Sequence, residues 1–195
     1  MRKLETKLEG PAFVELTKHG DERGFFAETY RSDKFAEMGI PTEWVQDNHS
    51  RSEGPVVRGL HFQMGAGVAK LVRCGRGAIY DVVVDLRKGS PTYGHAEGFE
   101  LTEDNMRVVY CPVGFAHGFC VVSDVADVMY KQSNYYADET ERGIAYNDPD
   151  VGIEWPLPIE ELIPSNRDAT APRLRDIEAD LPFVYAGGAL SAVGR

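Results

Sequence analysis

The chain has 195 residues, 43% of them hydrophobic, and its 31 acidic side chains outnumber the 21 basic ones to give a net charge of −10. This length and composition favour a single globular domain over residues 1–195 and exclude a disordered chain. So acidic a chain is not expected to bind nucleic acid or an anionic membrane, although a few converging cations could still hold a small anionic ligand.

The cysteines and the apolar runs indicate where the protein works. Cys74, Cys111 and Cys120 make an odd number without CxxC spacing, so a disulfide framework is not expected. No apolar run approaches the roughly 20 residues of a membrane-spanning helix. No apolar signal core follows the basic start of the chain. We therefore expect a cytoplasmic protein with reduced thiols.

Short β-rich runs separated by Gly, Pro, Asn and Asp dominate from about residue 12 to 146. Strands about ten residues apart indicate a sandwich or a barrel. The predicted strands are Phe25–Tyr30, Trp44–Asn48, Val56–Gln63, Ala69–Cys74, Ala78–Leu86, Gly98–Leu101, Arg107–Cys111, Phe115–Val122 and Asp127–Lys131. In the run 78–86 the alternation is clear: one face carries Ala78, Tyr80, Val82, Val84 and Leu86, and the other carries Asp81 and Asp85.

Helical patterns are sparse. A short helix is predicted over Asp33–Met38, with Ser32 as its N-terminal cap and Gly39 as its end. Further short helices are predicted over Pro158–Leu162 and Leu174–Ala179. From about residue 183 the composition is that of a mobile tail or of an arm that binds a partner.

Two short motifs indicate the kind of site. The segment Pro112–His117 reads P-x-G-x-x-H, the second half of the cupin signature, in which a turn leads into a strand that carries the His into a barrel. A metal-binding cupin also needs an H-x-H pair. Here that pair reads His61-Phe62-Gln63, and an amide is a poor ligand for a transition metal. We therefore expect cavity chemistry without a metal.

Several residues that could act in acid–base catalysis remain, and strand parity does not settle which of their side chains face the cavity. They are His61, Lys70, His117, Tyr130 and several Arg. Lys70 shares parity with Val72, so it either lies at a barrel rim or points into a cavity. Tyr130 is equally compatible with a core tyrosine and with a site residue. Arg58 and His61 have opposite parity, so both can face one cavity only if the strand bulges, for which Gly59 is a suitable position.

Seven motifs in unbroken order over about residues 12–175 resemble the dTDP-4-dehydrorhamnose 3,5-epimerase family. One departure is Asn166-Arg167, where many relatives have a Lys before the following Asp. The motifs are Asp21–Glu28, Val45–Ser50, Arg58–Gln63, Lys70–Arg73, Asp81–Arg87, Gly114–Phe119 and Asn147–Pro149.

The resemblance implies an all-β cupin jelly-roll barrel with a few short peripheral helices. It also implies a homodimer that exchanges N-terminal strands, a dTDP-linked 4-keto-6-deoxyhexose as substrate, and no cofactor. In the implied reaction the 4-keto group acidifies the C3 and C5 protons, a base removes one, and an acid returns a proton to the opposite face of the enolate.

The resemblance also assigns roles to residues. His61 matches the general base, Asp168 the carboxylate that orients it, Lys70 the cation beside the enolate oxygen, and Tyr130 the acid on the opposite face. The expected substrate-binding residues are Arg58 and His117 at the diphosphate or sugar, and Arg23, Phe26, Glu28, Gln46, Asn48 and Tyr136 at the nucleotide.

Three other functions stay open from sequence. One is an epimerase that acts at C3 alone or at C5 alone in a related deoxysugar pathway. Another is a metal-dependent cupin such as an oxygenase, and the third is a cupin that binds a sugar without catalysis. Proton exchange at C3 and C5 in deuterated water separates these possibilities.

Overall fold

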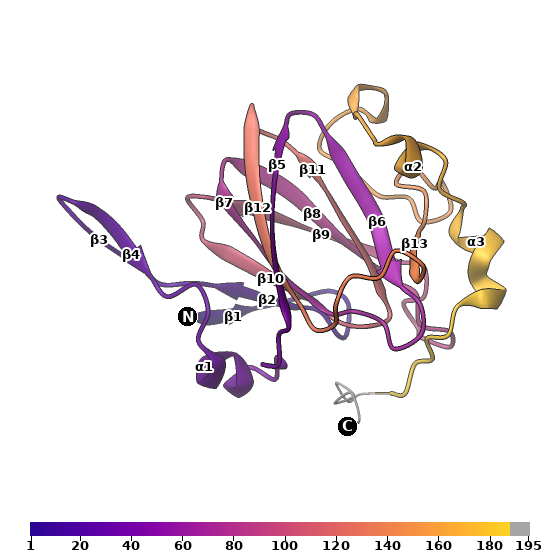
Figure 1. Cartoon of the computed structure of the whole chain (residues 1–195), viewed down its shortest axis with the longest axis horizontal. Coiled ribbons are helices and arrows are strands. Elements are labelled where there is room, and N and C mark those ends of the chain that lie inside the picture. The colour runs from indigo at the N-terminus through magenta and orange to yellow at the C-terminus, as the bar shows by residue number, and fades with distance from the viewer. Residues whose placement is uncertain (188–195) are drawn as a thin grey trace.

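Two β-sheets form the body of the protein, as the computed structural model of residues 1–187 shows (Figure 1). The six-stranded sheet has the order β1 (Arg2–Leu4), β2 (Ala12–Glu15), β10 (Arg107–Cys111), β7 (Lys70–Arg76), β12 (Val125–Gln132) and β5 (Gln46–Glu53). The five-stranded sheet has the order β13 (Glu141–Gly143), β6 (Val57–Gln63), β11 (Phe115–Val121), β8 (Ala78–Asp85) and β9 (Ala96–Thr102). This is the jelly-roll architecture that the sequence predicts.

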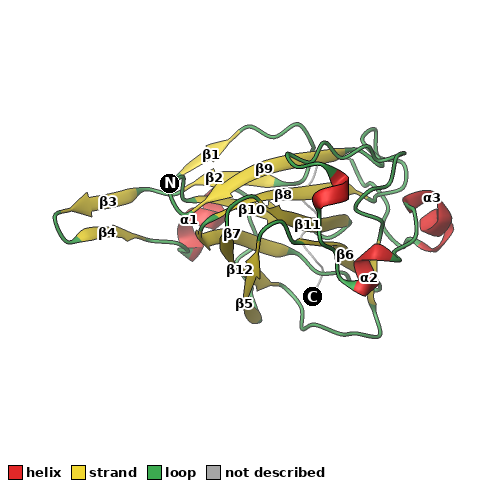
Figure 2. Cartoon of the chain, turned by 90° about the horizontal axis from the view of Figure 1, so that it is seen from above, coloured by secondary structure: helices red, strands yellow, loops and turns green. Residues whose placement is uncertain are grey.

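The helices are short and lie outside the sheets (Figure 2). They are α1 (Ser32–Glu37), the 3-10 turn η1 (Ile159–Glu161), α2 (Asn166–Ala169), α3 (Leu174–Ile177) and the 3-10 turn η2 (Glu178–Asp180). The three predicted helical segments are therefore confirmed. The predicted cap is wrong, because Ser32 is the first helical residue and the N-cap is Arg31, which makes no side-chain cap hydrogen bond.

The five-stranded sheet carries buried apolar residues on both faces. Between the sheets, Val72 of β7 packs with Ile79 and Val83 of β8. The alternate residues Val82 and Val84 of β8 pack on the far side, under the C-terminal segment. The acidic face of β8 predicted from its alternation therefore points into the barrel rather than to solvent.

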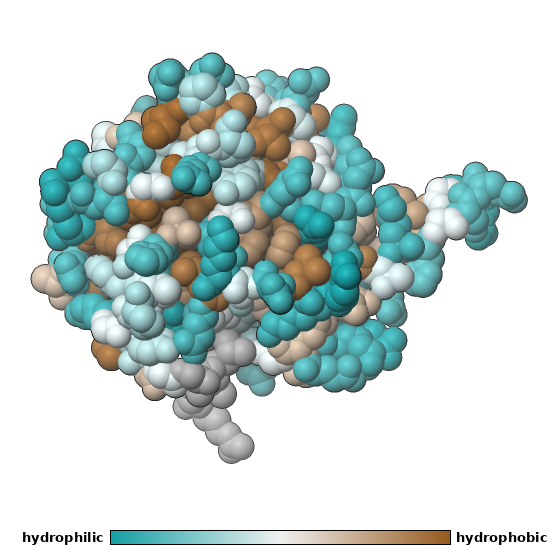
Figure 3. Space-filling model, turned by 180° about the vertical axis from the view of Figure 1, so that it is seen from behind, coloured by the Kyte–Doolittle hydropathy of each residue, from teal (hydrophilic) through white to brown (hydrophobic). Residues whose placement is uncertain are grey.

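The hairpin of β3 (Lys18–Asp21) and β4 (Gly24–Ala27) projects from the body (Figures 1 and 2). Its two strands pair only with each other among the described residues. The space-filling view from behind shows it standing clear of the rest of the surface (Figure 3). By contrast, the preceding strand β2 is paired on both sides, with β1 and β10.

Two boundaries differ from the predictions for physical reasons. The predicted strand Trp44–Asn48 continues instead to Glu53, because the whole polar run Gln46–Glu53 pairs with β12 and its polarity hides it from a hydrophobic pattern. The tail boundary near residue 183 is too early, since Phe183 is buried and its ring packs against that of Phe62. Residues 188–195 of the predicted tail lie outside the described part. Within residues 1–187 no helix is long and apolar enough to cross a membrane.

Candidate active site

A cavity of about 510 Å³ opens between the two sheets and brings together all four predicted catalytic residues. The five-stranded sheet contributes Arg58 and His61 from β6 and His117 from β11. The six-stranded sheet contributes Lys70 from β7 and Tyr130 from β12. Groups that can accept and donate protons therefore face the same space from opposite walls.

A histidine–carboxylate pair lies in this cavity. The Nε2 atom of His61 is 2.6 Å from Oδ1 of Asp168, which α2 carries. The backbone N–H of Asp168 is capped by Ser165 Oγ, and Gly59 N donates to the other carboxylate oxygen at 3.4 Å. Burial acts to raise the pKa of Asp168, but the hydrogen bond from His61 and the others outweigh it and lower the pKa. An ionised Asp168 can fix the tautomer of His61 and stabilise its imidazolium.

A β-bulge brings Arg58 and His61 to the same cavity. In the ladder with β11, His61 pairs with His117 and Arg58 pairs with Phe119, so three residue steps on β6 face two on β11. The extra residue is accommodated at Gly59, whose φ of +106° favours glycine and whose added Cβ would lie 2.7 Å from the Cα of Gly118. The bulge predicted from parity is thus confirmed.

A second histidine–carboxylate pair is more deeply buried. The Nε2 atom of His117 is 2.8 Å from Oδ2 of Asp81, and both side chains are buried. Burial lowers the pKa of His117, and the neighbouring Asp81 only partly opposes this. His117 is therefore neutral at ordinary pH and can act as a hydrogen-bonding group in the cavity.

Lys70 and Tyr130 face this pair from the other sheet. Lys70 is buried and lines the cavity, which resolves the parity question in favour of the cavity, and burial lowers the pKa of its ammonium group. Tyr130 is half-buried, and burial, followed by the charge of Glu141, raises the pKa of its hydroxyl group. A weakly hydrated cation and a phenol are suited to stabilise an enolate and to return a proton to it.

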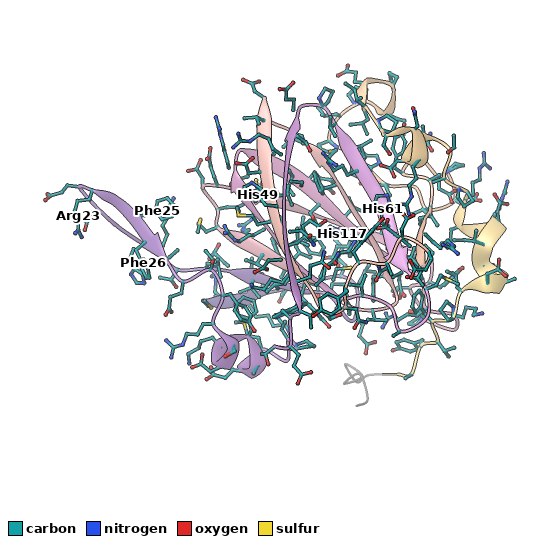
Figure 4. All side chains as sticks on the ribbon, in the orientation of Figure 1. Arg23, Phe25, Phe26, His49, His61 and His117 are labelled. Atoms are coloured by element: carbon teal, nitrogen blue, oxygen red, sulfur yellow. The ribbon has the colours of Figure 1, made fainter. Side chains whose placement is uncertain are left out.

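The predicted nucleotide-binding residues fall into two groups. Gln46, Asn48 and Tyr136 lie together, since the Gln46 amide donates to Asn48 Oδ1 and accepts from the backbone N–H of Tyr136, both at 2.9 Å. Arg23 and Phe26 lie on the hairpin that projects from the body, whereas His61 and His117 lie within the body, away from it (Figure 4).

Neither residue of the hairpin group contacts the cavity within one chain. The Phe26 side chain is 67% exposed, and Arg23 pairs with Asp21 of the same hairpin. Glu28, just after the hairpin, is an exposed residue paired with Arg31.

Sequence reasoning missed two acidic residues and one cation at the site. Glu141 of β13 and Arg167 of α2 line the cavity, and their side chains are 2.6 Å apart. A three-residue edge strand gives no pattern from which Glu141 could be found. Asp81 and His117 are both evident in the sequence, but their pairing is not, because it depends on the alignment of β8 with β11.

Gln63, which stands at the second His position of the metal-binding pattern, is buried. Among residues 1–187 no three His, Cys, Asp or Glu side chains are grouped in a way that could hold a metal ion.

A jelly-roll barrel whose cavity combines two carboxylate-paired imidazoles, a buried ammonium and a phenol defines a cupin-type acid–base enzyme. The model of the dTDP-4-dehydrorhamnose 3,5-epimerase family matches residues 5–176, and the chain belongs to this family of isomerases.

Its relatives include the dTDP-4-dehydrorhamnose 3,5-epimerase of Methanothermobacter thermautotrophicus, 46% identical over 90% of this chain and 95% of the relative. A dTDP-4-dehydrorhamnose 3-epimerase of Streptomyces niveus is 44% identical over 87% and 83% of the two chains. The solved structure of a Legionella pneumophila 3,5-epimerase in complex with dTDP-4-keto-L-rhamnose is 42% identical, with a TM-score of 0.91 over 95% and 99% of the two chains.

Proposed function

We propose that this enzyme epimerises a dTDP-linked 4-keto-6-deoxyhexose at C3 and C5, as in the biosynthesis of dTDP-L-rhamnose. The observation that carries the proposal is the placement of His61 and Tyr130 on opposite sheets around one cavity. Inversion at a carbon needs a base on one face and an acid on the other.

In the proposed reaction His61 takes the C5 or C3 proton, and the electron pair of the C–H bond moves into the enolate. Lys70 faces the developing negative charge on the C4 oxygen. Tyr130 then gives its hydroxyl proton to the opposite face of the carbon, and the keto group re-forms. Asp168 stays ionised and stabilises the imidazolium of His61.

Substrate binding is proposed for the remaining predicted residues. Arg58 and His117 would contact the diphosphate or the sugar, and Gln46, Asn48 and Tyr136 would contact the nucleotide. Arg can hold phosphate by paired hydrogen bonds, and amides can read a pyrimidine edge. No cofactor takes part in this reaction scheme.

The hairpin supports a homodimer with exchanged N-terminal strands. Phe25 and Phe26 are 58% and 67% exposed on a hairpin without further strand partners among residues 1–187. Exposed apolar side chains on a projecting element are typical of an interaction surface. We propose that Arg23, Phe26 and Glu28 complete the nucleotide site of a second copy, and that this single-domain enzyme works in the cytoplasm.

A second candidate function is epimerisation at C3 alone, which the similarity to the 3-epimerase of Streptomyces niveus supports. Incubation with dTDP-4-keto-6-deoxyglucose in deuterated water tests both candidates. Deuterium at C3 and C5 with inversion at both carbons supports the main proposal, and deuterium at C3 alone supports the second. Tight binding of the substrate without exchange at either carbon overturns both and leaves a sugar-binding protein.

A further inference from the structure

Two side-chain links run in parallel between α2 and one edge of the five-stranded sheet. In the first, Asp168 binds His61 at 2.6 Å. In the second, Nη1 of Arg167 donates to Oε2 of Glu141, also at 2.6 Å. β13, which carries Glu141, pairs with β6, which carries His61, so both links join the same two structural units.

The second link matters because α2 has little stability of its own. It is a helix of four residues, far shorter than the roughly 12–15 at which isolated helices become even marginally stable. Backbone hydrogen bonds hold the chain on either side, from Ile163 N to Pro55 O and from Ala145 N to Pro172 O. Between these anchors, the described side-chain bonds from α2 to the sheet are those of Arg167 and Asp168.

β13 also lies beside His61. Gly143 of β13 lies directly opposite His61, and an added Cβ at Gly143 would be 3.4 Å from Cδ2 of the imidazole ring. β13 is therefore next to the imidazole at Gly143 and is linked to α2 through Glu141. Movement of β13 away from α2 would change the geometry between His61 and Asp168.

The two links also separate the catalytic cavity from a second cavity of about 320 Å³ behind it. His61, Glu141, Arg167 and Asp168 line both cavities, so these four side chains form the wall between them. The Glu141 side chain is only 13% exposed, which limits the screening of its charge by solvent.

We propose that Glu141 and Arg167 form a positioning pair that holds Asp168 against His61 and closes the rear wall of the active site. The kinetic tests of this inference rest on the proposed function, whereas the NMR test of the contact between His61 and Asp168 does not. Neither residue needs to touch the reacting carbons. An error of about 1 Å in the placement of catalytic groups is enough to cost a factor on the order of 10² in rate.

The charges of the pair act on the opposite wall as well. Glu141 faces Arg167 and Asp168 on α2, His61 on β6, Lys70 on β7, Tyr130 on β12 and Tyr136 on the loop before β13. Burial lowers the pKa of Lys70, and the negative charge of Glu141 partly opposes this. Burial raises the pKa of Tyr130, where the charge of Glu141 adds to the rise and Arg58 opposes it. Arg167 partly neutralises the charge of Glu141. The ion pair therefore affects the pKa of Lys70 and of Tyr130, the two groups that must stay protonated.

The first test is Arg167→Gln in the full chain, with Arg167→Lys as the conservative variant. We expect Arg167→Gln to lower kcat about tenfold with less than about a threefold change in KM, and Arg167→Lys to restore most of the loss. Arg175→Gln is the control, because Arg175 of α3 also forms an ion pair, with Asp150 at 3.3 Å, but does not line either cavity. Arg175→Gln should leave kcat unchanged. A kcat within twofold of the wild-type value for Arg167→Gln would overturn the proposal.

The pH dependence separates positioning from a general loss of structure. Loss of Arg167 leaves the charge of Glu141 unopposed, so the alkaline limb of the kcat profile should move to higher pH. Glu141→Gln removes that charge, so the same limb should move to lower pH. Shifts of opposite sign support the pair, whereas equal losses of activity with unmoved limbs would overturn it.

The direct readout is the NMR signal of the His61 Nε2–H proton, which a short bond to Asp168 moves far downfield. Arg167→Gln should shift this signal upfield or broaden it, and Arg175→Gln should not. An unchanged signal in Arg167→Gln would overturn the positioning role. This measurement needs no turnover. If the wild-type protein fails to exchange substrate protons while the signal still responds to Arg167→Gln, the proposed function fails and the positioning pair stands.

Discussion

His61 and His117 lie directly opposite each other on the adjacent antiparallel strands β6 and β11, and each has its own carboxylate partner. The partners come from different elements, Asp168 from α2 and Asp81 from β8. The His61 side chain is 25% exposed, whereas the His117 side chain is only 7% exposed. This difference supports the proposal that His61, rather than His117, transfers the proton, because a base must reach the substrate and later exchange its proton with solvent.

His61→Ala should abolish deuterium exchange at both C3 and C5. Removal of a general base costs about 10²–10⁴ in rate, while binding of the nucleotide, which does not depend on the imidazole, should change far less. The measurement is mass gain of the sugar in deuterated water, together with the Kd for dTDP. His49→Ala is the matched control, since His49 is an exposed histidine outside the cavity. Near-full exchange by His61→Ala would mean that another group is the base.

Asp85 supports the fold rather than the reaction, and its contribution should depend on pH. The buried carboxylate accepts hydrogen bonds from Arg87, Ser90 and Thr92. Burial acts to raise the pKa of Asp85, but these hydrogen bonds outweigh it and lower the pKa. Because the folded pKa is depressed, this stabilisation is present above the unfolded pKa of about 3.9 and is lost as the pH falls through the folded pKa.

Asp85→Asn should therefore lower the free energy of unfolding by about 2–3 kcal/mol at pH 7, with the difference shrinking below about pH 4. Urea unfolding at a series of pH values measures this. Asp150→Asn, which alters an exposed ion pair, should cost less than about 1 kcal/mol. If the loss of unfolding free energy caused by Asp85→Asn grew as the pH fell, the stabilising role of the ionised Asp85 carboxylate would be contradicted.

The sequence predicts the barrel well because its strands are set by local signals. Gly and Pro punctuate the runs, and parity identifies Gly59 as the position of the bulge. The features that the sequence does not predict share a cause, because each depends on contacts between segments that are distant in the chain. The polar strand β5 is defined by its pairing with β12, and Glu141 is brought to the site by the pairing of β13 with β6. Asp168 was found only through the family resemblance, since its sequence context alone is that of a helix start.

Mixing two defective variants should restore activity if the hairpin completes the site of a second copy. An Arg23→Ala/Phe26→Ala chain keeps His61 but lacks the hairpin contacts, whereas a His61→Ala chain keeps the hairpin but lacks the base. In a two-fold symmetric dimer of one chain of each kind, one of the two sites is intact. Random reassembly should give about a quarter of wild-type activity. Sedimentation should show a dimer, and a stable monomer at micromolar concentration, or no recovery on mixing, would contradict the exchange.

Tyr130→Phe separates proton removal from inversion. Phe keeps the ring and its packing against the interior core, so folding should survive, but the hydroxyl proton is lost. Because His61 lies on the opposite sheet, it can still remove a proton and return a solvent-derived one to the same face.

We therefore expect Tyr130→Phe to incorporate deuterium while net epimerisation falls by about 10²–10³. Mass gain and product stereochemistry must be measured on the same sample, because only their ratio identifies the missing step. Full epimerisation by the variant would mean that water or another residue is the acid. Loss of both exchange and inversion would place Tyr130 in substrate positioning or enolate stabilisation. Retention of exchange without inversion is the outcome that only an acid on the second face explains, since the base on the first face would then be intact.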